Sequence, residues 1–327
     1  MNFHLEFSPR PFSTTINHQQ SLLLIGSCFT ENIGSKLKQF KFSVLENPNG
    51  ILFNPISIST SIDSYISNKQ YVADDLFYAN ECWNSWEHHS SFSNPDQSAC
   101  LQAINDSQQQ AHDFIKTADW LMLTVGSAFV YELKNEAVVA NCHKVPTDKF
   151  NKKLLTVDEV RNALQGTLDK LVAFNPSIKI IFTISPVRHL RDGFVENNRS
   201  KSALIQAVHQ LTNTEENILY FPAYELVIDD LRDYRFYAED MVHPNYAATN
   251  YVWEKFVATC IDEPTQKLMK EINVINAAKI HKPFNPTSAQ HKKFLQANLQ
   301  KIIELNKLYP YVDFEEERKY FDKAPSP

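Results

Sequence analysis

The sequence predicts an α/β fold in which helices cover both faces of a parallel sheet. Short apolar runs that suit buried parallel strands alternate with segments of helical periodicity along residues 20–260, and such alternation is typical of this class. Glycine is scarce, with six in 327 residues, and Gly26 and Gly126 each end an apolar run. Because sites in open parallel sheets form outside the carboxyl ends of the strands, these glycines mark the edge where we expect function.

The first predicted strand is residues 22–25, and the helix after it presents Ile33, Leu37 and Phe40 on one face. Residues 42–45 form the second predicted strand, and a stretch rich in turn residues follows it. The alternation then continues, so we expect helices at residues 102–117, 157–174, 201–211 and 246–260, and strands at residues 120–125, 178–184 and 218–221.

After Pro264 the character of the chain changes. The segment holds the proline-rich residues 283–286 and an amphipathic helical pattern whose apolar positions are Phe294, Leu295, Leu299, Ile302 and Ile303. We therefore expect two parts, a core domain over residues 1–263 and a helical extension over residues 264–327 that packs on it.

Composition limits the kind of protein. The chain is 43% hydrophobic with a net charge of -6, which argues against nucleic acid as the main partner. No apolar stretch approaches the roughly 20 residues that span a bilayer, and the first residues lack the pattern of a secretory signal. Five dispersed cysteines fit a reducing compartment better than a disulfide framework. We expect a cytoplasmic protein that needs no membrane; its oligomeric state is not predicted.

Ser27 and the pair Asp240 and His243 carry the main functional signal. Ser27 follows a predicted strand and opens a helix, whereas the acid and the imidazole stand three residues apart near the end of the core. A serine hydroxyl is a weak nucleophile, so acyl transfer requires a base to take its proton and an acid to orient that base. These residues predict a serine hydrolase that requires no cofactor, provided that the fold brings them together.

Each of these residues also has a simpler interpretation. Ser27 is a favoured helix cap, and a loop histidine such as His243 can cap the following helix. Cys28 is an alternative nucleophile, because a helix N-terminus lowers the pKa of a thiol. A metal site at the adjacent histidines His88 and His89 is the weakest alternative, since no spacing typical of metal ligands supports it; we expect no metal.

Gly26-Ser27-Cys28-Phe29 resembles the signature of the GSCFA family, a branch of the SGNH (GDSL-like) hydrolase superfamily. Four further segments resemble the same family: residues 47–55, 88–93, 141–146 and 185–189. The resemblance covers roughly residues 20–260. It implies a three-layer α/β/α fold of flavodoxin-like strand order, with a serine at the end of the first strand and an Asp-x-x-His pair near the end of the core.

The resemblance also implies roles for particular residues. Ser27 matches the nucleophile, His243 the general base and Asp240 the residue that orients it. The backbone N–H groups of Ser27 and Gly50 match an oxyanion hole. One departure stands out, because the superfamily has an oxyanion-binding asparagine two residues after a glycine, where this chain has Ala128 after Gly126. The candidates to replace this donor are Asn141, His143 and Ser127.

The substrate is predicted only by class. Arg188 follows a strand end and is a candidate to grip a carboxylate or phosphate on the substrate, with an ion pair within the protein as the alternative. The leading hypothesis is an esterase or O-deacylase acting on a small or carbohydrate-like ester. An acyltransferase and a ligand-binding module without chemistry are the alternatives, and a phosphate cradle at the helix N-terminus is weaker. The expected substrate-binding residues are Asn54, His89, Ser127, Asn141, His143 and Arg188.

Overall fold

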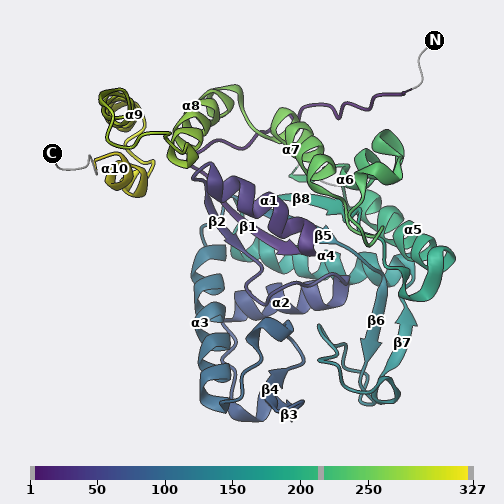
Figure 1. Cartoon of the computed structure of the whole chain (residues 1–327). Helices are drawn as coiled ribbons and strands as arrows, with labels where there is room; N and C mark the ends of the chain where they lie inside the picture. Colours follow the sequence, from purple (N-terminus) through teal and green to yellow (C-terminus); the bar gives the residue numbers. More distant parts are fainter. Residues whose placement is uncertain (1–3, 213–216, 323–327) are drawn as a thin grey trace.

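The computed structural model describes residues 4–212 and 217–322 and confirms the parallel sheet. Five parallel strands lie in the order β2-β1-β5-β8-β9 (Figure 1). Numbered along the chain, this order is 2-1-3-4-5, which is the flavodoxin-like arrangement. The strands are β1 (Ser21–Gly26), β2 (Ser43–Glu46), β5 (Trp120–Val125), β8 (Lys179–Ile184) and β9 (Ile218–Tyr220).

Helices cover both faces of the sheet, so the core has three layers (Figure 1). Leu23 and Leu121 face one apolar cluster, to which α2, α3, α4 and α5 contribute. Leu22 and Met122, on the opposite face of the same strands, join α1 and α7 in a second cluster. This alternation follows from the two-residue period of a strand. The helices are α1 (Cys28–Gln39), α2 (Pro55–Ser67), α3 (Gln97–Ile115), α4 (Val157–Phe174), α5 (Gly193–Thr212) and α7 (Tyr246–Cys260).

Two hairpins and one helix of the core were not predicted. The hairpins pair β3 (Leu76–Ala79) with β4 (Cys82–Ser85), and β6 (Phe129–Glu132) with β7 (Asn151–Leu154). Each of their strands has only four residues of mixed polarity, which gives little periodicity to detect. The unpredicted helix is α2, in which serine occupies several buried positions. The shorter elements are α6 (Ala223–Glu225), the 3-10 turns Ala73–Asp75, Ser90–Phe92, Thr147–Lys149, Leu190–Asp192 and Tyr234–Phe236, and a π-helical turn, Leu226–Leu231.

The last part of the chain is helical, with α8 (Glu263–Ile280), α9 (Ala289–Leu308) and α10 (Glu315–Asp322). These helices share an apolar cluster, and Phe40 at the end of α1 packs against it. Lys41 Nζ lies 2.8 Å from a carboxylate oxygen of Glu317 in α10. No helix among the described residues is long and apolar enough to cross a membrane.

The strand order locates the crevice in which a ligand is expected. The order reverses between β1 and β5, so the crossovers that leave these two strands run in opposite directions. Ligands of open α/β sheets bind at the carboxyl ends of the strands at such a reversal. Ser27 directly follows β1, and Gly126 directly follows β5.

Candidate active site

Ser27 lies at a tight junction between β1 and α1. An added Cβ on Gly26 would lie 2.4 Å from the Thr124 carbonyl oxygen, so only glycine fits before the serine. Ser27 caps α1, and its Oγ accepts the N–H of Phe29 at 3.3 Å. Its own backbone N–H meets no acceptor among the described residues. The serine therefore caps a helix and also keeps one N–H group free at the sheet edge.

Cys28 is a poor competitor for the role of nucleophile. Burial raises the pKa of its thiol, and the nearby Glu31 carboxylate raises it further. A thiol needs a lowered pKa to supply thiolate at neutral pH. The helix N-terminus does not outweigh burial at this position.

The segment after β2 joins the ends of β1 and β5. Asn47 Oδ1 accepts the Gly26 N–H at 2.9 Å, Leu52 N–H donates to the Gly26 carbonyl at 3.0 Å, and Gly126 N–H donates to the Phe53 carbonyl at 2.7 Å. The segment thus borders the crevice beside Ser27. The N–H of Gly50, expected in the oxyanion hole, donates instead to the Asn47 carbonyl oxygen at 2.7 Å. That donor is occupied in this structure.

Asp240 and His243 form a closed pair on one loop. Asp240 Oδ2 lies 2.6 Å from His243 Nδ1, and Asp240 Oδ1 accepts the backbone N–H groups of Val242 at 2.9 Å and His243 at 3.0 Å. These hydrogen bonds, first the one from the His243 backbone, lower the pKa of Asp240 to about 2. The ionised carboxylate favours a proton on Nδ1, which leaves Nε2 as the basic nitrogen. The His243 side chain is 48% exposed.

Arg188 braces this loop. Its backbone N–H donates to the Val242 carbonyl at 3.3 Å, and its guanidinium lies 4.4 Å from the ring centroid of Tyr237 and 5.4 Å from that of Tyr234. These contacts join the end of β8 to the loop that holds His243. The guanidinium forms no ion pair among the described residues; it stacks on two tyrosines, which could not be identified from the sequence, and its Nη1 is buried without a hydrogen-bond partner. The grip on a substrate stays a prediction.

A buried lysine on α5 contacts the residues that directly follow two neighbouring strands, β5 and β8. Lys201 Nζ, on α5, donates to the carbonyl oxygens of Gly126 and Ser185, each at 2.6 Å. Its charge acts on the Cys28 thiol, next to Ser27, and on the imidazole of His189. The charge of His243 also acts on His189. These groups therefore lie within electrostatic reach of one another along the carboxyl edge of the sheet.

Ser27 Oγ and His243 make no hydrogen bond with each other in the described part of the chain. Catalytic hydrogen bonds are often long in structures without substrate. The acid–imidazole pair is formed, and the serine lies at the same edge of the sheet. His189 also lies at this edge: its ring packs on Phe53, and burial together with the charge of Lys201 lowers its pKa to about 4.

Four of the expected substrate-binding residues make hydrogen bonds within the fold, and their contact with a substrate stays a prediction. Asn54 caps α2, because its Oδ1 accepts the Ser57 N–H at 2.8 Å and its Nδ2 donates to Ser57 Oγ at 2.9 Å. Ser127 Oγ accepts the Phe129 N–H at 3.0 Å. Asn141 Oδ1 accepts the N–H of His143 at 2.8 Å, and His143 Nε2 lies 2.9 Å from the Ser85 carbonyl oxygen. Of the candidate replacements for the missing asparagine, Ser127 has its hydroxyl engaged, whereas His143 Nδ1 is buried without a hydrogen-bond partner among the described residues.

His89 remains at the rim of the crevice. It is half-buried, and its Cβ would lie 2.4 Å from a Cβ added to Gly50. Burial lowers the pKa of its imidazole, and the Glu31 carboxylate of α1 opposes that shift. The positive φ of Gly50, 75°, and this close approach together require glycine at that turn.

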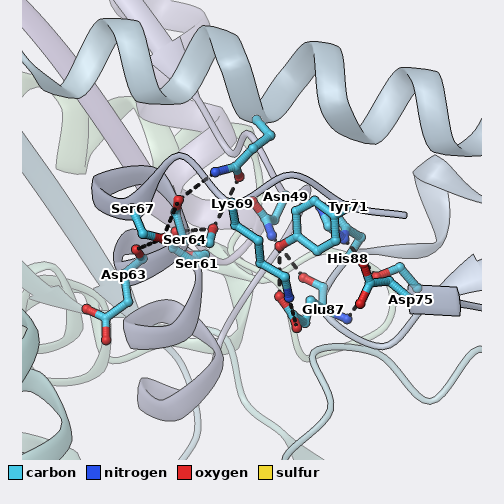
Figure 2. A network of polar contacts seen from close by, with 12 residues as sticks. Asn49, Ser61, Asp63, Ser64, Ser67, Lys69, Tyr71, Asp75, Glu87 and His88 are labelled. Atoms are coloured by element: carbon cyan, nitrogen blue, oxygen red, sulfur yellow. Dashed lines mark hydrogen bonds and ion pairs between the residues drawn. The ribbon is translucent and has the colours of Figure 1, made fainter. Parts of the chain in front are cut away.

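Figure 2 shows the polar network that includes Asn49, the residue before Gly50 in this turn. Tyr65 Oη donates to Asn49 Oδ1 at 2.6 Å, and Asn49 Nδ2 donates to the Glu87 carbonyl oxygen at 3.0 Å. The Glu87 carboxylate accepts Lys69 Nζ at 2.6 Å and Tyr71 Oη at 2.7 Å. Asn49 precedes Gly50, so the network fixes the loop between β2 and α2 against the segments that flank the β3–β4 hairpin.

No group of three or more His, Cys, Asp or Glu side chains that could hold a metal occurs within residues 4–212 and 217–322. The nearest candidates by sequence, His88 and His89, are used separately. His88 Nδ1 lies 2.9 Å from Ser85 Oγ, and His89 Nδ1 accepts the Ser91 N–H at 3.2 Å.

Comparison with family models identifies the chain over most of its length. The model of the GSCFA family matches residues 21–256, and the model named GSCFA domain protein, C-terminal domain, matches residues 272–324. The first match alone covers more than half of the chain. Among curated proteins, none matches this sequence.

Several solved structures show distant similarity. A carbohydrate esterase family 3 protein from Talaromyces cellulolyticus is 10% identical, with a TM-score of 0.37 over 78% of this chain and 99% of that chain. A putative platelet activating factor from Streptococcus pneumonia is 12% identical, with a TM-score of 0.40 over 73% and 83%. The acetyl xylan esterase Est2A from Butyrivibrio proteoclasticus is 12% identical, with a TM-score of 0.39 over 74% and 63%. Similarity at this level carries no argument about function.

Proposed function

The chain belongs to the GSCFA family, and from that premise we propose that it is a serine hydrolase of the SGNH type that cleaves an ester of a small or carbohydrate-like molecule. The observation that carries the proposal is the contact of 2.6 Å between Asp240 and His243 Nδ1, with an ionised carboxylate. A histidine oriented in this way is equipped to act as a general base. The serine that it would serve opens α1 at the same edge of the sheet.

In the proposed reaction, His243 Nε2 takes the proton of Ser27 Oγ as this oxygen attacks the ester carbonyl carbon. The carbonyl oxygen becomes an oxyanion, and the free backbone N–H of Ser27 donates to it. His243 then gives the proton to the alkoxide as the bond between carbon and the leaving oxygen breaks. Asp240 stabilises the imidazolium and remains ionised throughout.

The acyl group is then bound to Ser27 as an ester. Water attacks this ester while His243 takes one of its protons, and the carboxylic acid leaves as Ser27 Oγ recovers a proton. No step requires a cofactor. If an acceptor alcohol takes the place of water, the same groups carry out acyl transfer, which is the alternative reaction.

A binding module with this fold is the main competing function. The lack of a side-chain oxyanion donor at Ala128 favours it, because removal of one such donor typically lowers turnover about 10²–10³-fold. The formed pair of Asp240 and His243 opposes it. We retain a cytoplasmic location as part of the proposal, since all five cysteines are free thiols.

The test is labelling with a fluorophosphonate probe together with turnover of p-nitrophenyl acetate. We expect the wild-type protein to label and turn over, and Ser27→Ala to lose both. Ser67→Ala, at an exposed serine at the end of α2, is the matched control and should keep both. If the wild-type protein does neither, the binding module is favoured; if Ser27→Ala still labels, the nucleophile lies elsewhere.

A further inference from the structure

Lys201 is the most unusual charged residue of the core. It is 1% exposed and lies among the largest fully buried side chains of the molecule. It belongs to the apolar face of α5, with Leu204, Val208 and Leu211 at helical spacing after it. Burial of a charge without a counterion costs stability, so such a residue calls for a specific reason.

The surroundings of Lys201 supply no counterion. Its two hydrogen bonds go to neutral carbonyl oxygens, those of Gly126 at the end of β5 and Ser185 at the end of β8. No carboxylate forms an ion pair with it among the described residues. The titratable groups in its electrostatic range are the Cys28 thiol on α1 and the His189 imidazole after β8, with His243 and Asp192 acting on His189 in turn.

The proposed reaction provides few hydrogen-bond donors for the oxyanion, and the charge of Lys201 lies in that part of the site. An oxyanion that forms at Ser27 has the N–H of Ser27, but the N–H of Gly50 is occupied and Ala128 offers no side-chain donor. Ala128 is itself buried, and its N–H donates to Ser200 Oγ at 2.7 Å. The oxyanion is therefore left with few donors, and a cation that lacks a counterion lies within electrostatic range of Cys28, the residue after Ser27.

We propose that the Lys201 ammonium stabilises the developing oxyanion at Ser27 in place of the side-chain amide that this chain lacks. Lys201 acts from the buried interior, through its field and through its hydrogen bonds to the Gly126 and Ser185 carbonyls, and is thus a positioning residue. A buried, fixed charge stabilises developing charge more than a solvated one does, because the effective dielectric around it is lower. The inference rests on the proposed hydrolase function.

The charge state of Lys201 should make kcat depend on pH. Burial lowers the pKa of Lys201 to about 7. The ammonium is therefore present below that pH and is lost as the pH rises through it, so kcat should fall on the alkaline side of neutrality. The two groups on which its charge acts directly do not titrate in the same interval: burial raises the pKa of the Cys28 thiol above its usual 9.0, and burial lowers the pKa of His189 to about 4.

The experiment compares kcat and KM for p-nitrophenyl acetate between pH 6 and 9. For Lys201→Met, which keeps most of the apolar stem, we expect kcat at pH 6 to fall about tenfold to a hundredfold, with KM within about twofold and the alkaline decline abolished. Fluorophosphonate labelling should slow by a similar factor. Lys170→Met, at an exposed lysine on α4, is the matched control and should keep the wild-type pH profile.

The outcomes separate this inference from the proposed function. An inactive wild-type protein defeats the hydrolase itself. An active wild-type enzyme whose Lys201→Met variant keeps its kcat and its pH profile defeats only the role of Lys201. Should the methionine variant not fold, Lys201→Gln is the second variant. A wild-type kcat that is constant from pH 6.5 to 9 overturns the inference without any variant.

Discussion

Two histidines of this protein have the same local geometry and opposite surroundings. His243 Nδ1 lies 2.6 Å from an oxygen of Asp240, and His88 Nδ1 lies 2.9 Å from the hydroxyl of Ser85, in both cases three residues earlier in the chain. The His243 side chain is 48% exposed, whereas His88 is 1% exposed. Spacing alone therefore does not distinguish them.

The partner and the environment do distinguish them. Asp240 is an ionised carboxylate that accepts a hydrogen bond at His243 Nδ1. Ser85 offers only a neutral hydroxyl. Burial first, and then the charges of Lys69 and His143, lower the pKa of His88 to about 3. A histidine that cannot take a proton near neutral pH serves as a packing group, so the acidic partner and the access to solvent identify the candidate base.

Removing the charge of the acidic partner should have the largest effect. Asp240→Asn keeps the shape of the side chain but permits the other imidazole tautomer, so we expect the kcat for p-nitrophenyl acetate to fall by roughly 10⁴-fold. Ser85→Ala is the matched control at the other histidine and should change kcat less than about threefold. A loss below tenfold in Asp240→Asn would show that the carboxylate does not orient the base.

The parts of this comparison that depend on composition and order could be predicted from the sequence. Buried strands such as residues 120–125 are continuous apolar runs, and the structure confirms this strand at the same bounds. The Asp-x-x-His spacing was visible, and the exposure of His243 was not. Exposure depends on which loops lie above a residue, and those contacts come from distant segments.

Other features could not be predicted for related reasons. The N–H of Gly50 points at the Asn47 carbonyl because of the positive φ values at both residues, which a four-residue motif does not reveal. Lys201 did leave a signal, because a lysine interrupts the apolar face that continues at Leu204, Val208 and Leu211. Such an interruption indicates either a buried polar contact or a helix end, and only the contacts with Gly126 and Ser185 decide between them.

Giving His88 an acidic partner, as His243 has, should lower the stability of the fold. Ser85 is 3% exposed, so Ser85→Asp introduces a buried carboxylate beside His88. An ion pair between the two must form without water. We expect a loss of about 2–4 kcal/mol in the free energy of unfolding, measured with urea, since desolvation exceeds the attraction in such a pair. Ser85→Asn has the same volume without the charge and should lose less. Equal losses in the two variants would assign the effect to volume alone.

The last expected effect is on the pH dependence of stability. Burial lowers the pKa of His88 to about 3 in the fold, against 6.5 for an unperturbed histidine, so below pH 6.5 the unfolded chain binds more protons at this residue. Its contribution to stability is complete above pH 6.5 and is lost as the pH falls toward 3, at up to about 1.4 kcal/mol per pH unit. In His88→Gln the slope of unfolding free energy against pH between 6 and 4 should decrease by nearly one proton, whereas His281→Gln, at an exposed histidine, should leave it close to that of the wild type. An unchanged slope in His88→Gln would mean that His88 takes up its proton equally in both states, and the contrast with His243 would then rest on exposure alone.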